Sequence, residues 1–373
     1  MGAPWQGRVS ASGSVTSVTM RPRSDKVAER GCFTGVLETL GPRSSESDIQ
    51  SRQRRATLPW GWLAVAIAVL AGGAQPGASM VVTGPPVSSR HVVTVSSSEC
   101  AAGCPAPRTV AAASGLLRDV GFVVLEGAQS PLLGSTLVGE ARRAAADDLR
   151  DMLARLQRQG FDTDRDSFAF AEVVHRSVRR YDLRLDRRRM PPSAPWHNVS
   201  AAAAAWAVPV LATCGVQQEL EVAVEGVLTS LPGAPAQRFH QDGPLPGSFN
   251  CFVPLVDVVP EQHTGTEFWP GSHVHPAVPK LVQNGDLAVE DSSQLAVVSG
   301  DPNVHTVLPS LRAGDMLLYQ YRVVHRGAAN ASPHPRPIFY SGWSDTAGGG
   351  DGYNFKDHRR LADLERRQQL FGL

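Results

Sequence analysis

The sequence has few of the features that mark several large protein classes. Five cysteines in 373 residues are too few and too scattered for a disulfide framework, or for a structural zinc site with four clustered ligands. The net charge is +1, and no basic face with interleaved aromatic residues occurs in the second half of the chain. Nucleic acid is therefore excluded as a partner.

Three catalytic motifs are also absent. The chain has no Gly-x-Ser-x-Gly elbow, no Gly-x-x-x-x-Gly-Lys-Ser/Thr loop and no His-Glu-x-x-His pair. These absences remove the α/β-hydrolase, P-loop and zincin classes. The composition instead includes 28 prolines and 35 glycines with 42% hydrophobic residues, which favours a soluble domain rich in turns and β-strands.

The first part of the chain is typical of a targeting region. Residues 1–57 are rich in Ser, Gly and Arg, lack periodicity and end in the basic run Arg52–Arg55, which predicts a disordered basic leader. Residues 58–79 carry no charge, and their apolar part reaches about 25 Å as a helix, near the lower limit for a bilayer span. This segment is interpreted as a signal anchor or as a signal-peptide core.

Both interpretations place the later domain across the membrane, and they differ in whether that domain stays attached to it. An uncleaved anchor at residues 58–79 predicts a single-pass membrane protein with a lumenal or extracellular catalytic domain. Cleavage predicts a secreted or organelle-targeted protein. Residues 80–109 are predicted to be a Ser/Pro linker, residues 110–345 the folded domain, and residues 346–373 a glycine-rich linker with a tail that ends in a short amphipathic helix.

Hydrophobic periodicity predicts a mainly β fold with flanking helices. A strand is expected over Gly121–Gly127, a helix over Leu137–Gln159, and a second helix over Ala201–Val216 that Pro209 breaks. After Val216, short β-type runs alternate with turn residues. The runs are 220–231, 236–242, 248–258, 266–272, 304–308, 315–321, 323–327 and 337–343. Their spacing predicts a double-stranded β-helix core, the jelly-roll or cupin-like architecture.

The chain contains one His-x-Asp triplet, His240 and Asp242. Residues i and i+2 of a strand project to the same face, so the imidazole and the carboxylate lie side by side. A second histidine would complete the facial triad that holds Fe(II) and leaves positions open for substrate and oxygen. His325, at the end of a later strand run, is the candidate. A single triplet also arises by chance, so the prediction depends on these partners.

An arginine follows His325 at a distance of eleven residues. Arg336 opens a strand on which Ile338 and Tyr340 share its face. An inward guanidinium is costly unless it pairs with an anion, which suits an acidic co-substrate such as 2-oxoglutarate. Pro337 cannot donate to a sheet ladder, so the strand is expected to begin there or to lie at an edge.

A second histidine pair, His273 and His275, is the alternative metal site. A cupin-type centre needs a glutamate four or five residues later, where Pro279 and Lys280 stand. We therefore interpret His273 as a residue that lines the pocket and not as a ligand.

The motifs together resemble a known family. The segments FHQD, GTEFWPGSH, AGDMLLYQ and VVHRG, followed by Arg336, are similar in order and spacing to the phytanoyl-CoA dioxygenase family of Fe(II)/2-oxoglutarate oxygenases, from about Gly115 to Trp343. The resemblance implies that His240, Asp242 and His325 bind iron and that Arg336 anchors 2-oxoglutarate. It departs from the family at Gly327, where members often have a hydroxyl residue that contacts the same carboxylate.

The resemblance also implies an activity. Such an enzyme uses Fe(II), 2-oxoglutarate and O2 to hydroxylate a C–H bond of a small-molecule or lipid-like substrate, and it releases succinate and CO2. The alternative is a catalytically silent, membrane-associated β-domain that binds a ligand or a partner. A complete triad with Arg336 favours the enzyme, because a silent domain has no reason to bury four polar groups.

Overall fold

The computed structural model describes residues 89–214, 220–244, 246–260, 264–283, 286–287, 289, 292–345 and 359–371. The leader at 1–57 and the hydrophobic segment at 58–79 lie outside these residues, and so do the predictions made for them. Among the described helices, none combines the length and apolar character that a membrane span requires.

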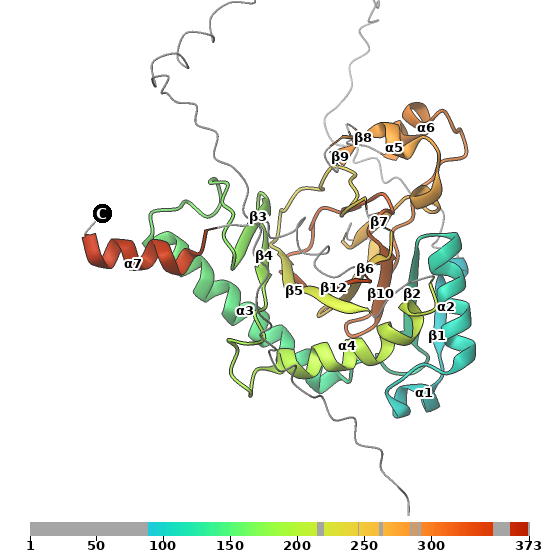
Figure 1. Ribbon diagram of the computed structural model, residues 1–373, viewed down its shortest axis with the longest axis horizontal. Coiled ribbons are helices and arrows are strands. Elements are labelled where there is room, and N and C mark those ends of the chain that lie inside the picture. The colour runs from blue at the N-terminus through green and yellow to red at the C-terminus, as the bar shows by residue number, and fades with distance from the viewer. Residues whose placement is uncertain are drawn as a thin grey trace, which may run out of the picture. The chain divides into compact units, whose positions relative to one another are not determined.

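Two sheets form the core. The large sheet has eight strands in the order β1-β2-β10-β6-β12-β5-β4-β3 (Figure 1). The strands are β1 (Val92–Val95), β2 (Phe122–Gly127), β10 (Met316–Gln320), β6 (Ser248–Pro254), β12 (Arg336–Ser344), β5 (Glu221–Ser230), β4 (Arg180–Arg184) and β3 (Val173–Ser177). β1 and β2 are parallel, whereas the other neighbours are antiparallel.

The second sheet is small and is extended by single bridges. β11 (His325–Gly327) pairs with β7 (Thr266–Phe268), and bridges add His240 beside His325 and Val307 beside Phe268. Phe268 stacks on Phe122 of the large sheet at 4.5 Å between ring centroids, so the two sheets face each other. The predicted double-stranded β-helix is confirmed, although the runs 236–242 and 304–308 contribute bridges and not full strands.

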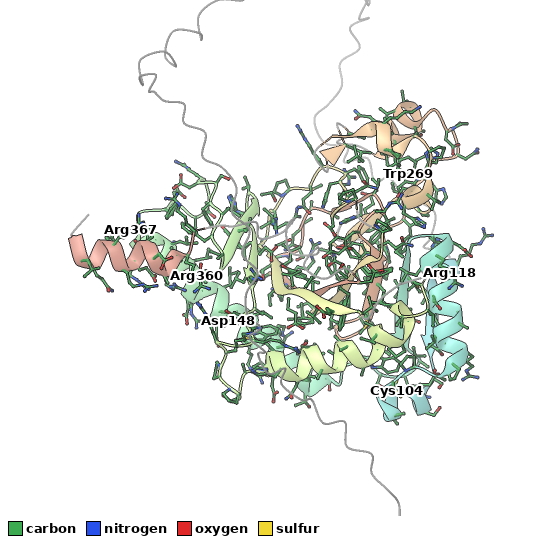
Figure 2. All side chains as sticks on the ribbon, viewed as in Figure 1. Cys104, Arg118, Asp148, Trp269, Arg360 and Arg367 are labelled. Atoms are coloured by element: carbon green, nitrogen blue, oxygen red, sulfur yellow. The ribbon has the colours of Figure 1, made fainter. Side chains whose placement is uncertain are left out.

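Three helices cover the outer face of the large sheet (Figure 1). They are α2 (Pro107–Asp119), α3 (Ser135–Arg158) and α4 (Pro195–Leu211). Apolar side chains of these helices pack on alternate residues of the strands, such as Leu318 and Phe339. Figure 2 marks Asp148 where α3 meets α4, and its carboxylate accepts a hydrogen bond from Trp196 Nε1 at 3.0 Å.

The predicted break of the second helix at Pro209 is wrong. α4 begins at Pro195 and runs through Pro209 to Leu211. A proline in a helix removes one backbone donor and crowds the preceding turn. Here it falls in the last turn, so α4 ends shortly after it.

The linker predicted over 80–109 is also wrong from Ser89 onward. This stretch forms the 3-10 turn η1 (Ser89–His91), strand β1, helix α1 (Ser97–Ala102) and the start of α2. β1 adds a parallel strand to the edge of the large sheet. Ser96 and Glu99 form a capping box at the start of α1. The Ser-x-x-Glu spacing of that box was the available sequence signal.

A small excursion separates β7 from the later strands. It contains η3 (Ser272–Val274), α5 (Val278–Leu281), β8 (Val282–Gln283), β9 (Asp286–Leu287) and α6 (Ser292–Ser299). Trp269, labelled in Figure 2, packs in its apolar centre with Phe239. Because Phe239 precedes His240, this excursion supports the segment that carries the His-x-Asp triplet.

The tail ends in the amphipathic helix that the sequence predicted. α7 spans Leu361–Phe371, and Leu361 is buried beside residues of α3 and β4. Arg155 of α3 donates two hydrogen bonds of 2.9 Å to the Glu365 carboxylate, so an ion pair adds to the apolar contact.

Candidate metal centre and co-substrate site

The two predicted histidines lie opposite each other in an antiparallel β-bridge. His240 N donates to His325 O at 2.8 Å, and His325 N donates to His240 O at 2.9 Å. Their ring centroids are 4.5 Å apart. The backbone ladder of the small sheet therefore brings together side chains that are 85 residues apart in the numbering.

Each imidazole is oriented by a backbone carbonyl. His240 Nδ1 lies 2.9 Å from Arg238 O, and His325 Nδ1 lies 2.9 Å from Val323 O. A carbonyl can only accept, so each Nδ1 carries a proton and Nε2 is the nitrogen that each ring offers to a metal. Such a hydrogen bond from the other ring nitrogen is typical of histidines that bind a metal.

Asp242 completes the group. Its Oδ1 is 3.8 Å from His240 Nε2, and its Oδ2 is 3.5 Å from His325 Nε2. One ligand atom from each of the three residues lies within 4.8 Å of the others. Two imidazole nitrogens and one carboxylate are the donor set that suits non-haem Fe(II), so the residues fit the metal.

Two residues that the sequence analysis missed hold the Asp242 carboxylate. Asn250 Nδ2 donates to Asp242 Oδ2 at 2.6 Å, and the Tyr319 hydroxyl donates to the same oxygen at 2.8 Å. Both come from the inner face of the large sheet. Partners of this kind orient a metal ligand and tune its affinity.

Burial and charge set the protonation of the group. Burial lowers the pKa of His325 to about 4, against the opposing effect of Asp242. Burial by itself would raise the pKa of Asp242, but His325, His240 and the Tyr319 hydroxyl outweigh it and lower the pKa. At neutral pH the site therefore presents a neutral His325 and an ionised Asp242.

A cavity of about 590 Å³ opens onto the three residues. Its wall is largely polar near the metal ligands and includes Arg176, Asp182 and Tyr340. Asp182 accepts from Arg176 at 2.6 Å and from the Tyr340 hydroxyl at 2.9 Å. Leu228 and Phe252 supply apolar wall. The cavity has room for a small molecule beside the metal ligands.

The structure places Arg336 on the inner face, as the alternation predicted. Ile338 and Tyr340 lie in the apolar cluster between the sheets, and β12 begins at Arg336, which accommodates Pro337. Arg336 is 4% exposed. Its Nη2 donates to Ser230 Oγ at 3.2 Å and to Ala328 O at 3.4 Å.

Arg336 retains unsatisfied hydrogen-bonding capacity. Its Nε and Nη1 atoms are buried without a hydrogen-bond partner among the described residues. A buried guanidinium with unpaired donors fits an anionic group that binds there, because an unpaired buried charge is strongly unfavourable. The site therefore fits the distal carboxylate of 2-oxoglutarate.

The alternative histidine pair does not reach the metal ligands. His273 is buried, with Nε2 2.8 Å from Arg118 O, and it packs against Gly121, so its interpretation as a residue lining the pocket is wrong. His275 Nε2 faces Asp301 at 3.8 Å.

A sequence model of the family described as "Phytanoyl-CoA dioxygenase (PhyH)" matches residues 117–338. This match covers more than half of the chain. The chain belongs to the phytanoyl-CoA dioxygenase family. Its members use Fe(II), 2-oxoglutarate and O2, so the chain is by class an Fe(II)/2-oxoglutarate-dependent oxygenase, as the resemblance implied.

One curated relative of this phytanoyl-CoA dioxygenase family member shares a short region with it. "Dioxygenase hkm4" of Aspergillus hancockii is 29% identical over 115 residues, which are 28% of this chain and 31% of that protein. The chain thus matches about a third of the length of that curated relative.

Solved structures also resemble the chain. The carbocyclase SnoK from nogalamycin biosynthesis is 22% identical, over 62% of this chain and 83% of that one, with a TM-score of 0.44. EctD from S. alaskensis, solved with 2-oxoglutarate and 5-hydroxyectoine, is 16% identical over 68% and 84% of the two chains, with a TM-score of 0.45.

Proposed function

We propose that this protein is an active dioxygenase that hydroxylates a C–H bond of a small molecule and releases succinate and CO2 from 2-oxoglutarate. The observation that carries the proposal is the joint presence of three converging metal ligands and a buried, partly unpaired Arg336. A silent binding domain has no use for both, since each group costs free energy to bury.

The residues would divide the work. His240, Asp242 and His325 would hold iron, which supplies the O2 and electron-transfer chemistry when it is bound. Asn250 and Tyr319 keep the Asp242 carboxylate in one orientation. Arg336 would receive the distal carboxylate of 2-oxoglutarate.

The cavity wall favours a polar substrate over a lipid-like one. Arg176, Asp182 and Gln241 lie on the wall together with the metal ligands. A long acyl chain would displace water from these polar groups without offering them hydrogen bonds in exchange, at a cost in binding free energy. We therefore propose a small substrate with hydrogen-bonding groups near the reacting carbon.

The sequence alone supports a location for this activity. The uncharged segment 58–79 and the basic run before it favour delivery to a membrane, with the catalytic domain on the lumenal or extracellular side. Carbonate extraction of membranes from cells that express the full chain tests attachment, and N-terminal sequencing tests cleavage. Recovery of the intact chain in the soluble fraction would contradict this proposal.

Anaerobic absorption spectroscopy tests the site directly. The full chain is titrated with Fe(II) and then with 2-oxoglutarate, in parallel with His240→Ala, whose fold is checked by circular dichroism. We expect a new visible charge-transfer band in the wild type only. A folded wild-type protein that shows no band would overturn the proposed function and favour a silent β-domain.

A further inference from the structure

A second arginine lies beside Arg336 on the inner face of the large sheet. Arg180, on β4, is fully buried. Its Nε donates to Ser230 Oγ at 2.9 Å, and its Nη2 donates to Ala328 O at 2.8 Å. Arg336 donates to the same two acceptors. The two guanidinium groups therefore share two acceptors, Ser230 Oγ and Ala328 O. Ala328 lies three residues after the metal ligand His325 in the sequence.

This pair of cations has no counter-ion among the described residues. The salt bridges of the described residues include none from Arg180 or Arg336. The nearest carboxylate along the strand, Asp182, is already engaged by Arg176 and Tyr340. Two buried like charges repel each other and lose hydration, so the arrangement requires an anion.

The protonation of the pair agrees with that view. Burial lowers the pKa of Arg180 to about 10. Burial, together with the charge of Arg180, lowers the pKa of Arg336 to about 9. Both groups stay cationic at neutral pH, and neither charge is stabilised by a negative partner among the described residues.

Gly327 provides the space that Arg180 uses. A Cβ atom at this position would lie 3.3 Å from Arg180 Cζ and 2.5 Å from Gln237 Oε1. A serine or threonine there would therefore press against the guanidinium. The residue that departs from the family pattern is thus the one whose missing side chain admits a second cation.

We infer that Arg180 is a co-substrate-binding residue, which pairs with Arg336 on the distal carboxylate of 2-oxoglutarate and takes the role that a hydroxyl side chain at position 327 plays in relatives. This inference rests on the proposed function, because it needs 2-oxoglutarate to bind beside the metal ligands. The inference goes beyond the proposed function because it assigns the second contact to the 2-oxoglutarate carboxylate to a residue of β4. This strand belongs to the large sheet, whereas position 327 lies on β11 of the small sheet.

A purely structural role is the competing explanation. Arg180 also donates to Pro235 O at 3.0 Å, so it ties the segment before the His-x-Asp triplet to β4. Loss of Arg180 would then loosen the metal site and weaken the binding of every 2-oxo acid to the same extent. A carboxylate-binding role, in contrast, weakens only those acids that carry a distal carboxylate.

Two 2-oxo acids separate the explanations. 2-Oxovalerate has the same chain length and the same chelating end as 2-oxoglutarate but lacks the distal carboxylate. We would measure the Kd of each acid by anaerobic titration calorimetry on the Fe(II)-loaded full chain. Arg180→Met should raise the Kd of 2-oxoglutarate by a factor on the order of 10 to 100 and leave the Kd of 2-oxovalerate almost unchanged. Arg180→Lys should lie between the wild type and Arg180→Met.

The matched control removes an arginine from the same strand. Arg184 ends β4 and lines a different cavity, together with Glu172 and Val222, so Arg184→Met should leave the preference for 2-oxoglutarate intact. Equal weakening of both acids by Arg180→Met, or no change in either, would overturn the inference and leave the proposed function standing. A wild type that binds neither acid would overturn both.

A complementary exchange tests the pairing of positions 180 and 327 and does not depend on one variant. Gly327→Ser alone should weaken 2-oxoglutarate, because the new side chain displaces Arg180. Gly327→Ser combined with Arg180→Met should bind 2-oxoglutarate more tightly than Arg180→Met alone, because the hydroxyl regains a contact. Strictly additive effects would contradict the inference, since independent sites add.

Discussion

The two faces of the large sheet have different roles, although the same strands form both of them. On the outer face, Leu318 and Phe339 pack against the helices, and the layer is closed by apolar contacts. On the inner face, Tyr319, Ser230 and Arg336 present polar groups toward the small sheet. Because side chains alternate along a strand, one face can stabilise the fold while the other carries groups that are unfavourable without a ligand.

The largest expected effect comes from removing the carboxylate on the functional side. Asp242→Ala should abolish iron binding and 2-oxoglutarate turnover, because two histidines alone do not complete the facial triad. The outer face is untouched, so the fold should remain. Iron content after anaerobic loading, succinate release and circular dichroism together check this result. Unchanged turnover would contradict the assignment of Asp242 as a ligand.

The converse change disturbs the outer face alone. Phe339 is fully buried and stacks on Trp196 of α4, with ring centroids 6.2 Å apart. Phe339→Ala should lower the free energy of unfolding by about 3–5 kcal/mol, because it leaves a cavity in the core. Urea denaturation measures this loss. Iron affinity of the folded variant should stay at the wild-type value, and a large fall would show that the two faces are coupled.

The smallest expected effect comes from removing one of the two hydrogen bonds that hold the Asp242 carboxylate on the inner face. Tyr319→Phe removes the hydroxyl that donates to Asp242 Oδ2 at 2.8 Å, while Asn250 continues to donate to the same oxygen. We expect iron affinity to fall by about tenfold, at the lower end for such supporting contacts. Competition with a metal chelator measures the change.

A buried tyrosine on the outer face of the large sheet serves as the control for Tyr319→Phe. The Tyr181 hydroxyl donates to Thr163 O at 2.9 Å in the apolar cluster beside α3. Tyr181→Phe should cost about 1 kcal/mol of stability without a change in iron affinity. If both variants lower the iron affinity equally, the hydrogen bond to Asp242 has no particular role in metal binding.

Much of the fold could be predicted from local patterns. The runs at 248–258 and 315–321 became β6 and β10, and the apolar stripe after Leu137 became α3. The strands β1, β3 and β4 were missed. β4 carries three charged residues in five, and a polar strand of this kind shows no apolar alternation, although tertiary contacts bury it almost completely.

The same reasoning applies to the candidate site. The short spacing of His240 and Asp242 is a local property, and the structure brings His325 to them. Asn250 and Tyr319 could have been assigned to the inner face by alternation, but no local pattern says which carboxylate they meet. Arg180 and Ser230 gave no signal at all, since their partner Arg336 lies on a strand more than a hundred residues later.

The sequence by itself determined which residue types were available and which face of a strand each would occupy, because strand periodicity depends only on neighbouring residues. The tertiary structure decided which faces meet. The register of β12 against β5 places Arg336 opposite Ser230, and the register of β4 against β5 places Arg180 opposite the same residue. Strand pairing over long separations depends on the packing of the whole domain, so the two arginines became a single anion-binding site only when the sheet was assembled.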